Sequence, residues 1–171
     1  MPPQITIRHA ESPADLDAIR TLFRQYAVYL NEVFGAAHIC LVAYDKEIAT
    51  LPGRYDLPDG QLLLARVDGE PAACVALYPL AVEELLPPDT SVCELKRLFV
   101  LPQFRGLHLG RRLSEELLAF ARTRSYNAIY LDTVPEVLPQ ATQLYTALGF
   151  QPVPHYNQNA TTGVKHFRLA L

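Results

Sequence analysis

The sequence is poor in cysteine, with only Cys40, Cys74 and Cys93 among 171 residues. The three are odd in number and far apart, so they do not form the close pairs typical of disulfide frameworks or zinc sites. The five histidines also lack a His-x-x-x-His spacing that would preorganise a tetrahedral metal site. We therefore expect a protein of a reducing compartment that binds no metal.

Long apolar segments are absent as well. The richest apolar run, residues 72–78, is stopped by Pro79 well before the ~20 residues that a membrane-spanning helix needs. The first ten residues lack the apolar core of a secretory signal. No Gly/Ser-rich linker, internal repeat or low-complexity tract divides the chain. We therefore expect a soluble, cytoplasmic protein that forms one domain over residues 1–171 and does not associate with a membrane.

The chain has no excess of positive charge, since 15 Lys+Arg against 18 Asp+Glu give a net charge of −3. Proteins that bind nucleic acid without regard to sequence depend on basic residues that displace counterions from phosphates. We therefore expect no nucleic-acid partner, and an acidic ligand must be met by a local basic cluster. Apolar residues, by contrast, are plentiful at 50%. A chain of this length buries roughly 70% of the surface that its unfolded form exposes, so it can build a core without metal or disulfide.

Apolar periodicity assigns most of the chain to strands and helices. The predicted strands cover residues 5–7, 61–67, 71–78, 92–100, 128–131, 150–156 and 163–169. The predicted helices cover residues 13–30, 44–50, 109–122 and 137–148. Ser12 and Pro13 supply an N-cap and a first-turn proline to the first helix. Asp68-Gly69 between two apolar runs predicts a hairpin with a type I′ turn. Helices, hairpins and one strand–helix–strand crossover indicate a mixed sheet covered by helices.

Residues 105–111, Arg-Gly-Leu-His-Leu-Gly-Arg, lie between the end of a predicted strand and the start of a predicted helix. Glycine allows a sharp turn that directs several amides at one anion, and the helix N-terminus adds partial positive charge. Arg105, Arg111 and Arg112 add full charges, which suits a pyrophosphate. Gly110 is not followed by the Lys-Ser/Thr of a P-loop, and a Rossmann fingerprint would follow the first strand of a βαβ unit instead of a hairpin.

At these residues the chain resembles the GNAT superfamily of N-acetyltransferases, which transfer an acetyl group from acetyl-CoA to a primary amine. The resemblance rests on Glu94-Leu-Lys-Arg-Leu-Phe-Val100, on the loop from Arg105 to Gly110, and on Ala141-Thr-Gln-Leu-Tyr-Thr-Ala-Leu-Gly-Phe150. It implies an α/β fold with a mixed, mostly antiparallel central sheet flanked by helices on both faces.

Two positions depart from the family pattern. His108 stands where a glycine is usual, and its Cβ narrows the allowed backbone angles. Either the loop binds phosphate in a modified conformation or His108 itself contacts the cofactor. Leu138 stands where many relatives carry an asparagine that helps to hold the coenzyme, so we expect that contact to be missing.

The resemblance implies acetyl-CoA as co-substrate. Its pantetheine arm would pair with the backbone of a strand exposed by a splay in the sheet, which makes Leu98, Phe99 and Val100 candidate contacts. A backbone N–H of this strand could also polarise the thioester carbonyl. The residues expected to hold the rest of the coenzyme are Arg105, Gly106, Leu107, His108, Leu109, Gly110 and Arg111.

The same resemblance implies two catalytic side chains. An amine with a lysine-like pKa of about 10.4 must lose a proton before it attacks a thioester. Glu94 is the candidate general base, directly or through a water, and the alternative is a solvated carboxylate paired with Lys96. Tyr145 is the candidate acid for the departing thiolate, and the alternative is a core aromatic with a satisfied hydroxyl. Cys93 has no partnered histidine in its sequence context, so we expect a buried thiol and direct transfer in a ternary complex.

The sequence says less about the pocket that binds the amine acceptor. The family builds this pocket from N-terminal helices and from loops that follow strands, which makes Tyr26, Tyr29, Phe34 and Tyr78 candidate wall residues. The acceptor is a primary amine of a small molecule or peptide, and a net charge of −3 does not choose among polyamine, amino acid, aminoglycoside and protein amine. Three alternatives stay open: transfer of a longer acyl chain, a CoA-binding regulatory module without turnover, and an interaction domain without cofactor. The resemblance also allows a homodimer.

Overall fold

The computed structural model describes residues 1–35, 41–81 and 90–171. A seven-stranded sheet runs through the molecule in the order β1-β2-β3-β4-β5-β7-β6. Its strands are β1 (Ile5–His9), β2 (Gln61–Val67), β3 (Glu70–Pro79), β4 (Val92–Val100), β5 (Ala128–Thr133), β6 (Gln151–Val153) and β7 (Lys165–Ala170). The helices are α1 (Pro13–Phe34), α2 (Leu41–Ala49), α3 (Leu109–Thr123) and α4 (Pro139–Ala147), with short 3-10 turns at Gly53–Tyr55 and Pro102–Phe104.

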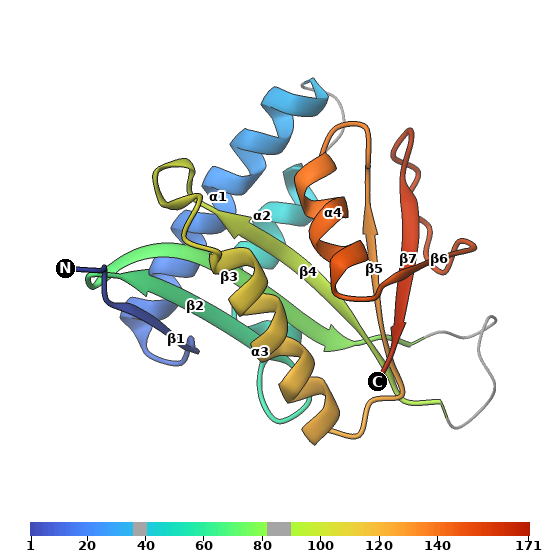
Figure 1. The fold of residues 1–171 in the computed structure, drawn as a ribbon, viewed down its shortest axis with the longest axis horizontal. Coiled ribbons are helices and arrows are strands. Elements are labelled where there is room, and N and C mark those ends of the chain that lie inside the picture. The colour runs from blue at the N-terminus through green and yellow to red at the C-terminus, as the bar shows by residue number, and fades with distance from the viewer. Residues whose placement is uncertain (36–40, 82–89) are drawn as a thin grey trace.

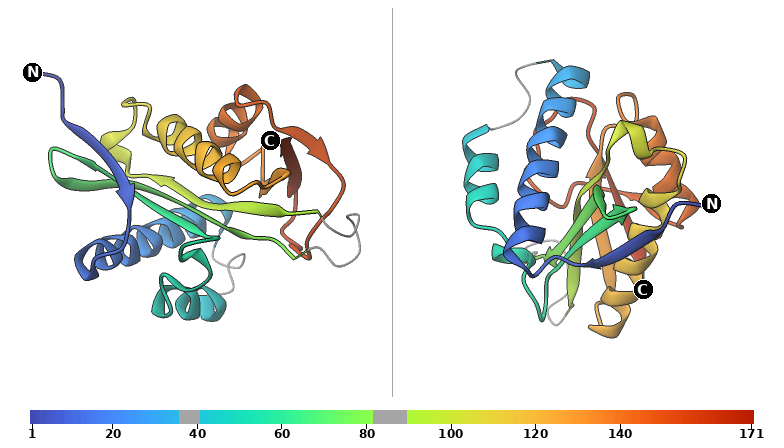
Figure 2. Two further views of the ribbon diagram at one scale, coloured as in Figure 1. Left: turned by 90° about the horizontal axis from the view of Figure 1, so that it is seen from below. Right: turned by 90° about the vertical axis from the view of Figure 1, so that its left-hand side faces the viewer.

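Helices cover both faces of the sheet (Figures 1 and 2). Figure 2 shows α1 and α2 on one face and α3 and α4 on the other. Among the strand pairs of the sheet, β4 and β5 are parallel and the others are antiparallel. The mixed, mostly antiparallel sheet predicted from the sequence is confirmed.

The predicted capping and turn residues behave as their chemistry requires. The Ser12 hydroxyl accepts a hydrogen bond from the Asp15 amide at 3.1 Å and caps α1. Asp68 and Gly69 have φ values of 50° and 87°, the positive pair that a type I′ turn needs. Helix α1 continues about one turn beyond its predicted end at residue 30, because Phe34 extends the apolar stripe before Gly35.

The C-terminal strands are shorter than predicted. β6 covers Gln151–Val153 instead of residues 150–156, because Pro154 has no amide to donate to a ladder. β7 begins at Lys165, after a turn in which Gly163 has a φ of 77°. The two strands pair antiparallel to each other, as expected.

β3 is buried on both faces and therefore reads as a continuous apolar run. Ala73, Val75 and Leu77 pack in the cluster beneath α3, whereas Cys74 and Ala76 pack in the cluster beneath α1 and α2. Leu109, Leu113 and Leu117 of α3 complete the first cluster. The centre of the sheet is therefore packed against helices on both faces.

The sheet opens between its two parallel strands. β4 and β5 pair only at Val92↔Ala128, Cys93↔Ile129 and Glu94↔Tyr130. Beyond these pairs the strands diverge (Figure 1), so residues 95–100 and 131–133 face each other across a gap in the ladder. The splay that the resemblance implied is present.

A β-bulge at Arg97 accompanies the splay. Arg97 has a φ of 62°, and the register with β3 shifts between Cys74 and Ala76. Strict alternation would place Leu95 and Arg97 on the same face. Instead, Leu95 and Leu98 both pack on the α3 side, because the bulge adds one residue to the strand. Lys96 and Arg97 consequently lie together on the α1–α2 side.

Cys74 and Cys93 are buried free thiols, and Cys40 lies outside the described residues. Burial raises the pKa of Cys74 to about 12 and raises that of Cys93 as well. The prediction that Cys93 is a buried thiol is confirmed. Within residues 1–35, 41–81 and 90–171, no helix has the length and apolar character needed to cross a membrane. In that same part of the chain, no group of His, Cys, Asp and Glu is arranged to hold a metal ion.

Candidate active site

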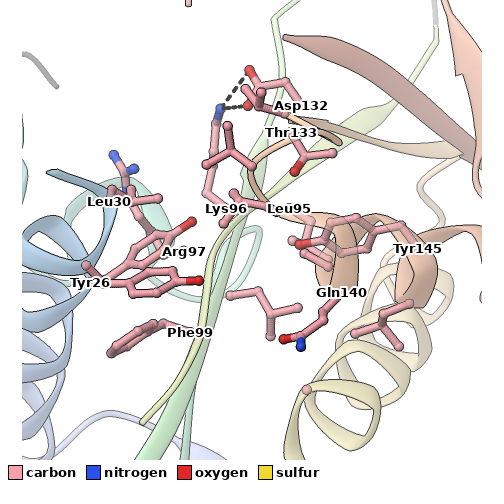
Figure 3. Close-up of a pocket in the computed structure, with 18 of the residues that line it drawn as sticks. Tyr26, Leu30, Leu95, Lys96, Arg97, Phe99, Asp132, Thr133, Gln140 and Tyr145 are labelled. Carbon is pink, nitrogen blue, oxygen red and sulfur yellow. Dashed lines mark hydrogen bonds and ion pairs between the residues drawn. The ribbon is translucent and has the colours of Figure 1, made fainter. Parts of the chain in front are cut away.

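A pocket of about 720 Å³ occupies the splay between β4 and β5. α1 and α2 wall one side of it, and α4 and the start of α3 wall the other (Figure 3). The predicted site residues that line it are Tyr26, Tyr29, Phe34, Leu98, Phe99, Val100, Arg105, Gly110 and Tyr145. Most of the predicted site therefore comes together around one opening, from segments more than a hundred residues apart in the chain.

The loop at residues 105–111 presents free amides at the N-terminus of α3. The Arg105 amide donates to Pro102 O at 3.2 Å and the Arg112 amide to His108 O at 3.1 Å. In the described part of the chain, no backbone carbonyl accepts from the amides of residues 106–111. Free amides at a helix N-terminus form a site for an anion. Gly110 places this loop at the edge of the pocket.

His108 adopts a backbone conformation that favours glycine. Its φ of 56° and ψ of 23° lie in the left-handed region, directly before α3. This conformation costs a non-glycine residue about 1–2 kcal/mol. The imidazole is exposed and, among the described residues, has no hydrogen-bond partner. The loop therefore adopts a left-handed turn at His108 despite the Cβ, and no described hydrogen bond of the imidazole stabilises the turn.

Two arginines flank the free amides. Arg105 lines the pocket, and its guanidinium carbon lies 5.3 Å from the centroid of the Tyr29 ring. Arg111 is exposed and its Nη1 lies 3.4 Å from Oε1 of Glu115. A surface ion pair of this kind is weak, so the Arg111 guanidinium can turn to an anion at the loop.

Tyr145 projects from α4 into the pocket, where Figure 3 shows its hydroxyl directed at the opening. The residue is only 6% exposed, and its ring packs edge-on against Phe150 at 5.8 Å between centroids. Burial raises the pKa of the Tyr145 phenol above its ordinary value, so the group keeps its proton at neutral pH. The described residues offer its hydroxyl no hydrogen-bond partner, unlike the satisfied core tyrosine of the alternative interpretation.

Glu94 does not line the pocket and is only 1% exposed. Its Oε1 accepts from the Tyr156 hydroxyl at 2.8 Å and lies 2.9 Å from Lys96 Nζ. Its Oε2 accepts from the Tyr78 hydroxyl. Tyr78, a predicted wall residue, therefore lies beside Glu94 and outside the pocket lining. The pairing with Lys96 that we considered is present, but the carboxylate is buried and not solvated.

Lys96 connects Glu94 to a second carboxylate at the pocket. Its Nζ lies 3.0 Å from Oδ1 of Asp132, and Asp132 Oδ2 also accepts from Asn157 at 2.7 Å and Asn159 at 3.1 Å. Burial disfavours charge on both Lys96 and Asp132. The charges of Glu94 and Asp132 nevertheless raise the pKa of Lys96. The charge of Lys96, with the asparagine hydrogen bonds, lowers the pKa of Asp132. Both groups therefore stay charged at neutral pH.

Arg97 forms the corresponding ion pair with α2. Its Nε and Nη2 donate to the two oxygens of Glu47 at 2.9 and 2.7 Å, and its guanidinium lies 4.4 Å from the Tyr44 ring centroid. Tyr55 donates to the same carboxylate at 2.6 Å. Burial opposes ionisation of Glu47, but these hydrogen bonds and the charge of Arg97 hold its pKa below the ordinary value. The pair fastens α2 to the bulge.

Sequence reasoning missed the roles of Glu47, Arg97, Asp132 and the asparagines at 157 and 159. One available signal was Asp132 itself, a polar residue at the carboxyl end of a short apolar strand, where ligands of α/β sheets gather. The Glu47–Arg97 pair has no comparable signal, because its partners are far apart in sequence and the bulge reverses the side of Arg97.

Leu138 also lies at the pocket. It is the N-cap residue of α4, makes no side-chain capping bond and lines the opening. An apolar side chain therefore lines the opening at the position where the sequence departs from the pattern of the resemblance.

A mixed sheet that opens beside free helix amides defines a class of α/β protein suited to a long ligand with an anionic end. Residues 18–150 match the model of the Acetyltransferase (GNAT) family, and the chain belongs to this family.

Individual relatives agree with this assignment. An N-acetyltransferase of Schizosaccharomyces pombe is 33% identical over 171 residues, which cover 99% of this chain and 97% of the relative. The PaiA N-acetyltransferase of Thermoplasma acidophilum, solved with coenzyme A, superposes with a TM-score of 0.74 at 15% identity, over 98% of this chain and 99% of that one. The yncA structure of Salmonella typhimurium, solved with acetyl-CoA, gives a TM-score of 0.68 at 21% identity, over 97% and 93%. At these identities the two structures show a shared fold.

Proposed function

We propose that this protein transfers the acetyl group of acetyl-CoA to a primary amine of a small molecule or peptide, by direct attack in a ternary complex. The observation that carries the proposal is the row of free amides at residues 106–111 beside the open splay. The complexes of the two related structures with coenzyme A and acetyl-CoA support it.

The residues at the splay suit the diphosphate and the pantetheine arm of this coenzyme. The amides of residues 106–111, with Arg105 and Arg111, would hold the diphosphate. The backbone of Leu98, Phe99 and Val100 lies on the part of β4 without a β5 partner, so it can pair with the pantetheine amides. When bound, the coenzyme supplies an acetyl group activated as a thioester.

Tyr145 is the group we assign to the leaving sulfur. As the amine nitrogen bonds to the acetyl carbon, the carbon–sulfur bond breaks and the sulfur needs a proton. The Tyr145 phenol faces the pocket, carries its proton at neutral pH and has no competing partner among the described residues. A positioned acid of this kind typically contributes 10²- to 10⁴-fold in rate.

Glu94 is the group we assign to the proton of the acceptor ammonium, acting through water. Direct contact is not available, because Glu94 lies behind Lys96 and does not line the pocket. Oε2 accepts one described hydrogen bond, from Tyr78. A carboxylate oxygen can accept more than one, so Oε2 keeps the capacity to accept from a bridging water.

Two alternatives make different predictions. A transferase for a longer acyl chain would release thiol faster from longer thioesters than from acetyl-CoA. A regulatory module would bind CoA without turnover. The free, protonated Tyr145 hydroxyl favours turnover over the module, because a binding module does not need an unpartnered acid in its pocket.

A panel of primary amines incubated with acetyl-CoA tests the proposal, with free thiol and product mass as readouts. We expect acetyl-CoA to raise the melting temperature by mass action, and at least one amine to release thiol with a product heavier by an acetyl group. Stabilisation without thiol release from any amine would support the regulatory module. No stabilisation at all would overturn the coenzyme site itself.

A further inference from the structure

Thr133 holds a buried polar atom without a partner. The residue is 7% exposed and lies at the end of β5, past the last pair with β4. Across the described residues, its Oγ1 is the buried side-chain oxygen or nitrogen for which no hydrogen bond is found. It lines the pocket, and Figure 3 shows its hydroxyl directed into the opening.

The side of β5 on which Thr133 lies explains why no described protein group forms a hydrogen bond with this hydroxyl. Ile129 and Leu131 pack in the core beneath α3, and alternation along β5 places Thr133 on that same side. The polar network of Asp132 lies on the opposite side, with Lys96 and the asparagines. Thr133 therefore belongs to the face of Tyr145, where the expected leaving sulfur would lie.

The α4 side of the pocket is mostly apolar. Of residues 137–144, those that line the pocket are aliphatic apart from Gln140. Proteins rarely leave a buried hydroxyl unpaired, since its lost hydration is not replaced. A hydroxyl directed into a pocket is satisfied when the occupant of the pocket offers a polar atom.

We infer that Thr133 is a binding residue for the arm of the coenzyme, and that its hydroxyl donates a hydrogen bond to a carbonyl oxygen there. This inference rests on the proposed function. The arm offers amide carbonyls, present in CoA and acetyl-CoA alike, and a thioester carbonyl, present only in acetyl-CoA. Both are carbonyl oxygens on a chain that must pass between β4 and β5.

The test replaces the hydroxyl by a methyl group of the same shape. Thr133→Val should leave the melting temperature of the free protein unchanged or raised, because no internal hydrogen bond is lost. The same variant should weaken coenzyme binding by about 2- to 13-fold, the loss of one hydrogen bond. Thr133→Ser keeps the hydroxyl and should bind within about threefold of the wild type. Melting curves and calorimetric titrations with CoA and acetyl-CoA measure both effects.

Tyr126→Phe supplies a contrast in stability. The hydroxyl of the buried residue Tyr126 donates to Asp59 O at 2.7 Å, so its removal should lower the melting temperature of the free protein. A merely structural threonine would behave like Tyr126, and a binding threonine would not.

The outcomes of these experiments test the role of Thr133 separately from the proposed function. Equal weakening of CoA and acetyl-CoA by Thr133→Val identifies an amide carbonyl, and weakening of acetyl-CoA alone identifies the thioester. Unchanged affinity for both, or a lowered melting temperature with unchanged affinity, overturns the role of Thr133 and leaves the proposed function standing. A wild-type protein that binds neither ligand removes the proposed function and this inference together.

Discussion

The ammonium of Lys96 lies 2.9 Å from Oε1 of Glu94 and thus stands between this buried carboxylate and the pocket. The arrangement keeps Glu94 in a network that also includes Asp132 on the next strand. A base so placed can accept a proton only through an intermediary. Acceptor deprotonation would then depend on the ordering of water in the site as well as on the carboxylate.

Glu94→Gln tests this arrangement. The amide keeps the shape, and its single oxygen can accept from one of the two tyrosines, but it cannot take a proton. We expect kcat/KM to fall by about 10²- to 10⁴-fold at neutral pH and to rise with pH as free amine becomes available. Rates measured from pH 6 to 10 check this. The exposed Glu70→Gln is the matched control, and a pH profile like that of the wild type would remove Glu94 from the mechanism.

Tyr145→Phe removes the proposed acid without changing the ring that packs on Phe150. We expect kcat to fall by roughly 10- to 1,000-fold, because the sulfur then leaves as an unassisted thiolate. The dissociation constant of CoA and the melting temperature should stay close to those of the wild type, since no described residue loses a hydrogen bond. Full turnover in a folded variant would return Tyr145 to the role of a core aromatic.

His108 offers a test of the loop. If backbone amides hold the diphosphate, His108→Gly should bind CoA at least as tightly as the wild type, because glycine adopts a φ of 56° without strain. His108→Val should bind CoA more weakly and melt lower, since a β-branched residue is poorly tolerated there. Titration calorimetry compares the two. Loss of binding in the glycine variant would show that the imidazole itself contacts the coenzyme.

The Glu47–Arg97 pair should support both stability and pocket shape. Arg97→Ala leaves the largely buried Glu47 without its bidentate partner, and we expect the free energy of unfolding to drop by about 3 kcal/mol. Urea denaturation measures this, with the exposed Lys46→Ala as a control that should change little. A loss below about 0.5 kcal/mol would mean that the pair is as weak as a surface ion pair.

His166 should make stability depend on pH. Burial lowers its pKa from the ordinary 6.5, so the unfolded chain binds a proton at a pH where the folded protein does not. Stability from this source is present above about pH 6.5 and is lost as the pH falls towards the folded pKa. We expect the melting temperature to drop between pH 7 and 5, and less so in His166→Gln. Equal slopes for the two proteins would contradict the prediction.

The sequence predicted the elements and the loop well because their signals are local. An N-cap serine, an Asp-Gly turn and a three- to four-residue apolar spacing act within a few residues of the chain. The free amides at residues 106–111 follow from where a strand ends and a helix begins. Tyr145 was predicted from its motif, and its role as the acid stays a prediction.

The polar groups behind the pocket were not predictable in this way. The bulge at Arg97 moves a cation to the opposite face from that expected by alternation. The sequence suggested that Glu94 is a base facing the pocket. In the structure Glu94 is buried, and it accepts hydrogen bonds from Tyr78 of β3 and from Tyr156 of a loop. The unpaired Thr133 is visible only when every neighbour within reach is known.

The local sequence thus specified the helices, most of the strands, the hairpin and the turn with free amides at residues 106–111, because propensity, capping and apolar period act over one or two turns. The packing of distant segments set which charges pair, which carboxylate reaches the opening and which hydroxyl stays free. Burial and electrostatic pairing depend on all neighbours in space, and no short stretch of sequence contains them.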